Sequence, residues 1–401
     1  MTTPKRLLAG CLIALSGLLL LWACTTSHEA GQQAAPAAAA PLAQVVALLE
    51  AGELDQALEQ VAAVPADAPD YAVAQLVRGD LLAARKGSPD RPPLRDGDPQ
   101  VVALAEDVRL RLRSEDAVPP PGTVPNTVLQ LAAPYRHLVV VDLGRARLYL
   151  LENRGADGLQ LVRHHYAAMG RNGTRKQERG DLRTPVGVYH ITQWIPDAQL
   201  PELYGAGAFP VSYPNPWDRF LGRTGYGIWL HGVPRQTLTR PPRSSEGCVT
   251  MANEDLDWLR PYLEIGQTPV IFSDELEWVP PAEASRELDT WLARVEDWRS
   301  KWSALDTEGY LAYYGDNFTT AGMNRSQFAA HKRRVNAGKR FIDVRLRDLN
   351  VFNYPGAGEP LILVEFTMAY RSDNYAMTTK KQQFWRRNAQ GEWQIFREEN
   401  R

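Results

Sequence analysis

The sequence predicts a multidomain chain with a small helical N-terminal region, a mostly-β domain and a C-terminal α+β domain shaped as a cone. The length of 401 residues suits two or three domains. Apolar residues recur first at helical spacing, then in short β-type runs, and finally in a helix followed by four more such runs. Proline-rich stretches separate these segments.

Composition limits the classes of function. Hydrophobic residues make up 44% of the chain, which is enough to fill real cores and excludes wholesale disorder. Lys and Arg number 45 against 47 Asp and Glu, for a formal net charge of -2. The basic excess that phosphate-backbone binding requires is missing, so we expect no nucleic-acid partner.

Residues 1–23 are predicted to be a signal peptide. Two basic residues precede the apolar run Leu7–Ala23, as in a charged n-region followed by an h-region. The run ends at Leu21-Trp22-Ala23-Cys24, which resembles the lipobox of bacterial lipoproteins. The resemblance implies a lipid on Cys24 and a periplasmic protein anchored to a membrane, and Thr25 favours the outer membrane. An ordinary signal peptide cleaved nearby, or an uncleaved anchor, is the alternative.

The region after Cys24 is predicted in three parts. Residues 24–42 are rich in Ala, Gln and Pro and form a tether. Residues 43–113 carry apolar positions at helical spacing and form a helical accessory domain. Residues 114–135 hold five prolines and form a linker.

Two folded domains follow the linker. Residues 136–273 contain a β-hairpin and further short β-type runs, which predict a mostly-β domain. Residues 285–401 begin with a helix that carries an apolar and tryptophan-rich stripe, and four β-type runs come later. This second pattern resembles the nuclear-transport-factor-like fold, a helix-backed cone of antiparallel strands.

Cysteine use identifies a candidate nucleophile. Of the three cysteines, Cys11 lies in the signal peptide and Cys24 is assigned to the lipid. Cys248 is then a lone thiol in a compartment where cysteines are normally paired, so it is an accident, an intermolecular link or a reactive group. His231 lies 17 positions upstream at the end of a strand-like run, and imidazole is the usual base for a thiol. The alternative is a buried thiol near a structural histidine.

Separated motifs in a fixed order favour the reactive thiol. These are Thr184-Pro185-Val186-Gly187, then Tyr226-Gly-Ile-Trp-Leu-His231-Gly232, then Ser245-x-Gly247-Cys248-Val249. Together they resemble the YkuD-type L,D-transpeptidase catalytic domain, followed here by a nuclear-transport-factor-like domain as in L,D-carboxypeptidases. The resemblance implies that Cys248 is the nucleophile and His231 its general base, that the Gly232 carbonyl orients the imidazole, and that the Gly247 and Cys248 amides form the oxyanion hole.

The chain departs from the family pattern at two positions. Glu246 stands where the family commonly has His, and Thr250 stands where it commonly has Arg. The carboxylate of Glu246 is expected to raise the pKa of the thiol. Loss of the arginine leaves the substrate's carboxylates to other residues, for which we name Arg243, with Arg240 or Arg235 as alternatives; Tyr226 and Ser245 complete the expected substrate-binding set.

The resulting expectation is cysteine-dependent acyl transfer on peptidoglycan stem peptides, in cell-wall remodelling and cell shape. The acceptor is left open: water gives trimming by an L,D-carboxypeptidase, and an amine gives cross-linking by an L,D-transpeptidase. We expect this reaction to need no cofactor. We also expect no metal site, because the adjacent His164 and His165 lie in a strand and face opposite sides. The C-terminal domain is expected to bind an envelope protein. The rival hypothesis is a non-catalytic envelope scaffold that binds peptidoglycan or partner proteins.

Overall fold

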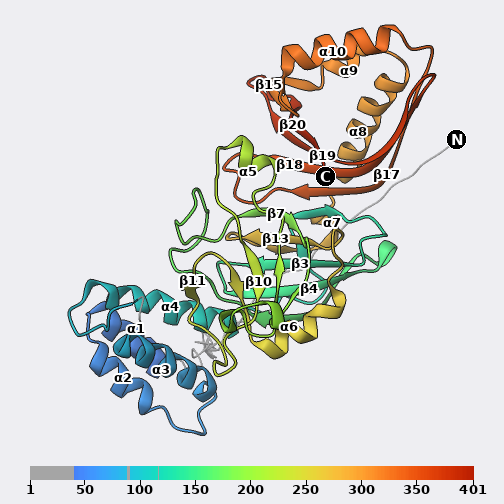
Figure 1. The fold of residues 1–401 in the computed structure, drawn as a ribbon. Coiled ribbons are helices and arrows are strands. Elements are labelled where there is room, and N and C mark those ends of the chain that lie inside the picture. The colour runs from blue at the N-terminus through green and yellow to red at the C-terminus, as the bar shows by residue number, and fades with distance from the viewer. Residues whose placement is uncertain (1–39, 88–90, 116) are drawn as a thin grey trace, which may run out of the picture.

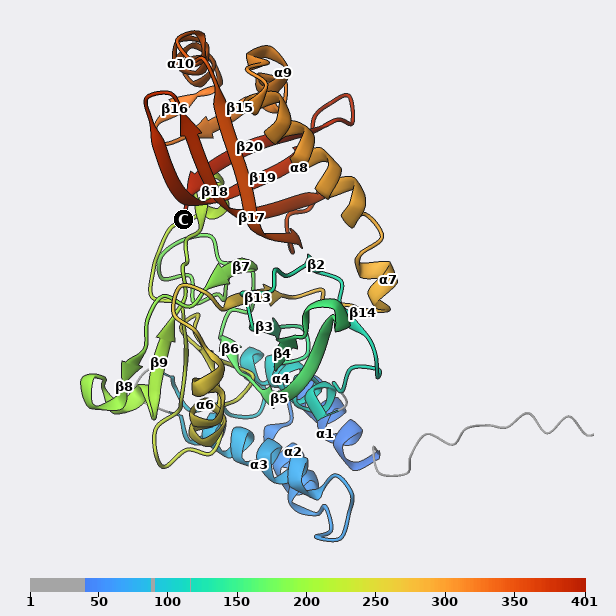
Figure 2. The ribbon, with the colours of Figure 1, turned by 90° about the vertical axis from the view of Figure 1, so that its right-hand side faces the viewer.

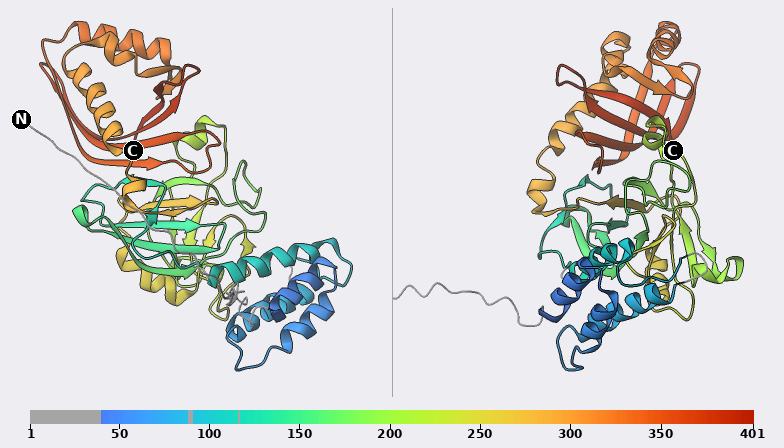
Figure 3. Two further views of the ribbon diagram at one scale, coloured as in Figure 1. Left: turned by 180° about the vertical axis from the view of Figure 1, so that it is seen from behind. Right: turned by 90° about the vertical axis from the view of Figure 1, so that its left-hand side faces the viewer.

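A computed structural model of the chain describes residues 40–87, 91–115 and 117–401. A helical region, a central β domain and a C-terminal domain follow one another, and the first and last lie at opposite ends of the central domain (Figures 1 and 3). The expected signal peptide, Cys24 and most of the tether lie outside the described residues. Among the helices of the described ranges, none is long and apolar enough to cross a membrane.

The helical region contains four α-helices around one apolar core. Its helices are α1 (Ala40–Glu50), α2 (Leu54–Ala62), α3 (Tyr71–Lys86) and α4 (Pro99–Glu115). In α2 the apolar positions recur every three or four residues, and these side chains are the buried ones. Each helix therefore contributes one apolar face to a shared core.

Two larger sheets and the two-stranded pair β11-β6 build the described part of the central domain. A five-stranded sheet has the order β5-β4-β3-β13-β7, and a four-stranded sheet has the order β12-β10-β9-β8. Their strands and the nearby elements are β3 (His137–Asp142), β4 (Arg147–Asn153), β5 (Leu159–Tyr166), β6 (Met169–Gly170), β7 (Gly187–His190), β8 (Ile195–Pro196), β9 (Gly207–Pro210), α5 (Pro216–Phe220), β10 (Trp229–His231), β11 (Arg243–Ser245), β12 (Val249–Thr250), α6 (Asn253–Leu259) and β13 (Pro269–Ser273).

The five-stranded sheet is buried on both faces at its inner strands, whereas its edge strand β5 is largely exposed. Side chains alternate across a strand, so β3 sends Val139 and Val141 to one face and Leu138 and Val140 to the other. The first pair joins the core shared with the four-stranded sheet. The second pair joins a core shared with the C-terminal domain. The central domain thus uses one sheet to hold both its own second layer and its neighbour.

The C-terminal domain is the predicted cone of helices and a curved sheet, which is antiparallel except where β15 pairs with β20 in parallel. The stripe predicted on its long helix α8 is buried, with Trp291, Val295, Trp298 and Trp302 inside. The helix runs along the concave side of a seven-stranded sheet (Figure 2). The elements are α7 (Pro281–Ala284), α8 (Leu288–Ser303), α9 (Thr307–Leu311), β15 (Tyr314–Thr320), β16 (Met323–Asn324), α10 (Arg325–Ala337), β17 (Ile342–Asn353), β18 (Leu361–Ser372), β19 (Ala376–Arg387) and β20 (Trp393–Asn400).

Residues 114–135, expected to be a plain linker, are partly built into sheets. Within them, β1 (Val124–Pro125) pairs with β14 (Trp278–Val279), and β2 (Val128–Gln130) pairs with β17 at the edge of the C-terminal sheet. Prolines favour an extended backbone and are tolerated at sheet edges, so a proline-rich segment can still add short edge strands. The segment connecting the first two domains therefore also joins the third.

The junction between the central and C-terminal domains is apolar and ionic. Trp217 of α5 stacks on Phe384 of β19, with ring centroids 6.0 Å apart. Beside them the buried Glu365 carboxylate lies 3.2 Å from His190 of the central domain and 3.2 Å from Arg401. Burial alone would raise the pKa of Glu365, but His190 and Arg401 outweigh it and lower the pKa to about 2. The two domains are thus packed together by groups that would be costly to separate.

Replacing Phe384 by Ala tests this junction. The ring is fully buried, so Phe384→Ala is expected to lower the free energy of unfolding by about 3 kcal/mol. Urea titration followed by tryptophan fluorescence measures it. The exposed Tyr375, changed to Ala, is the control and should shift stability by less than about 0.5 kcal/mol. Equal effects of the two changes would contradict the packing described.

Candidate active site

Parallel pairing of two short strands sets the positions of His231 and Cys248. Strand β10 pairs with β12 so that Leu230 lies beside Val249 and His231 beside Thr250. Cys248 directly precedes β12 and therefore lies beside Trp229, two residues before His231 and on the same face. Strand spacing and rise give about 8 Å between the Cα atoms of His231 and Cys248, which the two side chains can bridge.

The backbone of the next residue orients the imidazole of His231. Its Nδ1 lies 2.7 Å from the carbonyl oxygen of Gly232. A carbonyl only accepts, so Nδ1 carries the proton and Nε2 keeps the lone pair that a general base needs. Burial lowers the pKa of His231 to about 4, with the charge of Arg240 adding to the shift and the Gly232 bond opposing it. The imidazole is therefore neutral at physiological pH.

The thiol of Cys248 is also neutral in this structure. Its Sγ lies 3.3 Å from the Gly227 carbonyl oxygen and donates to it. Burial raises the pKa of the thiol to about 11, and the Glu246 carboxylate adds to the shift in the direction expected from the sequence. The Trp229 amide, Arg240 and Lys176 oppose it. Within the described residues no hydrogen bond joins Cys248 to His231, so the pair is a neutral thiol beside a neutral imidazole.

Ser245 was expected to bind substrate and the Gly247 amide to form part of the oxyanion hole, but the two groups bond to each other. The Ser245 hydroxyl is buried, donates to the Cys248 carbonyl oxygen at 2.6 Å and accepts from the Gly247 amide at 3.1 Å. Both of its bonds hold the nucleophile's loop, so Ser245 positions Cys248 instead of facing substrate. Because the Gly247 amide is already bonded, the Cys248 amide remains our candidate oxyanion donor.

Gly247 is required for a steric reason. Its φ is +125°, a value that side chains rarely allow, and a Cβ would lie 2.7 Å from the Arg183 carbonyl oxygen. Its own carbonyl accepts a 2.9 Å bond from the hydroxyl of the fully buried Thr184. The turn before the nucleophile is thus fixed from the outside by residues 183 and 184.

The expected substrate-binding residues lie in different surroundings. Tyr226 is 69% exposed, and the guanidinium of Arg179 stacks over its ring at 5.0 Å. Arg243 points to the helical region, where its Nε lies 2.6 Å from the Asp107 carboxylate. Arg235 pairs with Asp197 on the surface. Of the arginines named from the sequence, Arg240 is the one whose charge acts on both His231 and Cys248.

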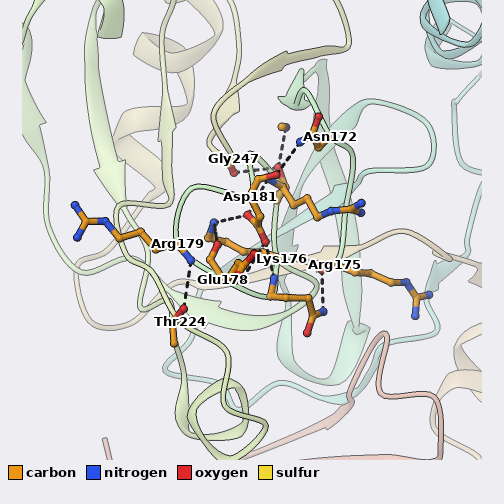
Figure 4. Close-up of polar contacts among 12 residues, drawn as sticks. Asn172, Arg175, Lys176, Glu178, Arg179, Asp181, Thr224 and Gly247 are labelled. Carbon is orange, nitrogen blue, oxygen red and sulfur yellow. Dashed lines mark hydrogen bonds and ion pairs between the residues drawn. The ribbon is translucent and has the colours of Figure 1, made fainter.

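A loop that the sequence analysis did not single out lies near Gly247, the residue before the nucleophile (Figure 4). The buried Lys176 donates to the Asp181 carboxylate at 2.6 Å, and that carboxylate also accepts three backbone amides. Burial alone would raise the pKa of Asp181, but these bonds outweigh it and lower the pKa. The Asp181 carboxylate therefore holds this loop together, and the charge of Lys176 favours the thiolate of Cys248. A Lys-x-x-x-x-Asp spacing was the signal available, and it is too common to be diagnostic.

Asn253 is a second residue that sequence reasoning missed. Its side-chain oxygen accepts the amides of Ala206 and Val233, at 2.8 and 3.2 Å, and its amide donates to the Val233 carbonyl oxygen at 2.8 Å. A Cβ on Gly232 would lie 2.1 Å from that side-chain oxygen. Asn253 thus locks the turn that carries the Gly232 carbonyl, and only glycine fits there.

Other chemistry has little support at this site. In the part of the chain that the structure describes, no group of three or more His, Cys, Asp or Glu side chains could hold a metal ion. Thr250, at the position where the family commonly has Arg, is buried beside His231, and its hydroxyl has no hydrogen-bond partner among those residues. The residues brought together are a thiol, an imidazole and cations, which suits acyl transfer.

Comparison with known proteins defines the class. Residues 136–272 match the family described as the YkuD L,D-transpeptidase catalytic domain. Residues 290–399 match the family described as the Cds6 C-terminal NTF2-like domain, where NTF2 is a nuclear transport factor. The chain therefore contains an L,D-transpeptidase catalytic domain followed by an NTF2-like domain, as the sequence motifs predicted.

Two solved structures share this domain order. Bd1075 of Bdellovibrio bacteriovorus is 27% identical, with a TM-score of 0.60, over 69% of this chain and 98% of that protein. Pgp2 of Campylobacter jejuni, described as a helical cell shape determining protein, is 23% identical, with a TM-score of 0.56, over 72% of this chain and 98% of Pgp2. No curated protein matches the chain.

The neutral pair predicts how Cys248 responds to pH. Only the thiolate is alkylated, so with a thiol pKa of about 11 the rate with iodoacetamide should rise about tenfold per pH unit up to about pH 10. Peptide mass spectrometry measures modification of Cys248. His231→Gln should leave this profile unchanged, because a neutral imidazole does not assist ionisation. A plateau below about pH 8 would instead indicate a thiolate–imidazolium pair.

Proposed function

We propose that this protein is a cysteine-dependent acyltransferase that acts on the stem peptides of peptidoglycan, in cell-wall remodelling and cell shape. The observation that carries the proposal is the 2.7 Å bond between His231 Nδ1 and the Gly232 carbonyl oxygen. It presents the basic Nε2 on the strand that pairs with the Cys248 strand. The same bond satisfies the buried Nδ1–H and leaves the lone pair of Nε2 available to accept a proton.

Catalysis begins from the neutral pair. The thiol rotates from the Gly227 carbonyl toward His231, and Nε2 takes its proton as sulfur attacks the carbonyl of the substrate's L-centre. Proton transfer is coupled to formation of the C–S bond, because a free thiolate is disfavoured by burial. The Cys248 amide stabilises the oxyanion. The imidazolium then protonates the leaving D-amino acid, and a thioester remains on Cys248.

The acceptor completes the reaction. Water, deprotonated by His231, hydrolyses the thioester and gives a trimmed stem peptide, whereas an amine gives a cross-link. The charge of Arg240, which acts on both His231 and Cys248, is the positive charge that we assign to a stem peptide's carboxylates. Arg240 would then compensate for the family arginine that is replaced by Thr250.

We also propose that Cys24 carries a lipid and anchors the protein in the periplasm, at the outer membrane. The lipobox-like end of the apolar run is the support for this part. The domain order shared with Pgp2, which is described as a cell shape determining protein, is the support for a role in cell shape.

An adduct experiment tests the acyl-transfer proposal. Incubation with disaccharide tetrapeptides should add an acyl mass to Cys248, detected by intact and peptide mass spectrometry. Cys248→Ser should remain folded and form no thioester. His231→Ala should slow acylation by about 10²- to 10⁴-fold, the range for a lost general base. A folded wild-type protein that never forms the adduct would refute the proposal.

Product analysis separates the two acceptors. Release of tripeptides and D-alanine identifies hydrolysis, and formation of dimers identifies transpeptidation.

A non-catalytic scaffold is the second candidate function, favoured by the Gly227 bond that holds the thiol away from His231. A scaffold should still bind sacculi when Cys248 is changed to Ser. The wild-type protein should then form neither tripeptides nor dimers.

A further inference from the structure

The helical region binds the segment of residues 240–243, which leads to Cys248. Arg243, the first residue of β11, donates from Nε to the Asp107 carboxylate of α4 at 2.6 Å and from Nη2 to the Ala103 carbonyl oxygen at 2.7 Å. Asp107 and Arg243 are 136 positions apart in the chain. This contact therefore belongs to the packing of the two domains, not to local structure.

A second contact holds the same segment three residues earlier. The carbonyl oxygen of Arg240 accepts two bonds, from Arg111 of α4 at 2.9 Å and from the Tyr166 hydroxyl at 2.8 Å. The Arg111 guanidinium is buried, lies 4.3 Å from the centre of the Tyr166 ring, and is bidentate to Asp80 of α3. Residues 240 and 243 are thus both bound to helices of the N-terminal region.

Burial of these charges is costly, which favours a positional role. Burial raises the pKa of Asp107 to about 6 although Arg243 opposes the shift. Burial also raises the pKa of Asp80 against the opposing effect of Arg111. The ion pairs therefore fail to recover the full cost of removing the carboxylates from water. Apolar side chains would stabilise this interface better, but they would not fix a guanidinium fork in one direction.

A short stretch of chain connects Arg243 to the loop of Cys248. Strand β11 runs from Arg243 to Ser245 and pairs with β6 of the central domain. Ser245 then holds both the Gly247 amide and the Cys248 carbonyl oxygen through its hydroxyl. A displacement of Arg243 thus passes to Cys248 through two residues and one hydroxyl.

We propose that the Asp107–Arg243 pair is a positioning device, through which the helical region holds the Ser245–Cys248 turn in its reactive geometry. Its catalytic consequence rests on the proposed acyl transfer, but its effect on the turn and the thiol does not. Asp107 and Arg243 are positioning residues, because they act on substrate only through Ser245 and Cys248. The arginine first named as a substrate ligand acquires a different role.

The test compares Asp107→Ala with Glu106→Ala in the full chain. Glu106 is the neighbouring acid on α4, but it pairs with Arg109 and Arg113 of the same helix. Asp107→Ala should speed amide exchange in residues 243–250 by about tenfold, because a local opening becomes easier. It should also move the pH profile of Cys248 alkylation to lower pH, because a looser turn admits water to the thiol. Glu106→Ala should change neither.

Arg243→Gln removes the other half of the pair from the central domain. It should reproduce both effects, and the double variant should exceed neither single change, as expected for groups that act as a unit. Amide exchange in residues 40–115 shows whether Asp107→Ala disrupts the helices. If it does, Arg243→Gln alone tests the proposal. Wild-type exchange and alkylation in Arg243→Gln would overturn the proposal. Neither readout needs turnover, so a wild type without a muropeptide adduct would refute acyl transfer and leave this result standing.

Discussion

The parallel pairing of β10 with β12 is the constraint on which the site depends. Parallel neighbours cannot be joined by a tight turn, so the chain leaves the sheet after His231 and must re-enter it at the opposite end, just before Val249. That excursion carries Arg240 and Arg243 to the edge of the domain, where α4 meets them. The requirement that brings a base beside a thiol therefore also creates the loop that another domain can hold.

Burial decides the protonation state of the pair. Burial disfavours the charged form of each group, the anionic thiolate and the cationic imidazolium. It therefore raises the pKa of Cys248 and lowers the pKa of His231. Arg240 and Lys176 favour the thiolate, and Glu246 opposes it, yet all three are weaker than burial at Cys248. A substrate carboxylate near Arg240 would offset the charge that favours the thiolate. Proton transfer to His231 during the attack therefore suits this site better than ionisation before the attack.

The sequence was sufficient for features that are local and insufficient for those that link distant segments. The motif order identified the catalytic domain, and the family resemblance assigned to Gly232 the carbonyl that lies 2.7 Å from His231 Nδ1. The tryptophan stripe of α8 identified the C-terminal cone. By contrast, Ser245 was taken for a substrate ligand, because the sequence does not show that its hydroxyl turns back to Cys248. Asn253 and the Asp107–Arg243 pair were missed because their partners are 20 and 136 positions away.

The attachment of the C-terminal domain has a mechanical consequence. The five-stranded sheet presents one face to the catalytic strands and the other to the C-terminal sheet, so a single layer separates the two. The linker adds β2 to that sheet, and the buried Glu365, His190 and Arg401 close the junction. With three independent attachments the domain is held rigidly, not on a flexible tether.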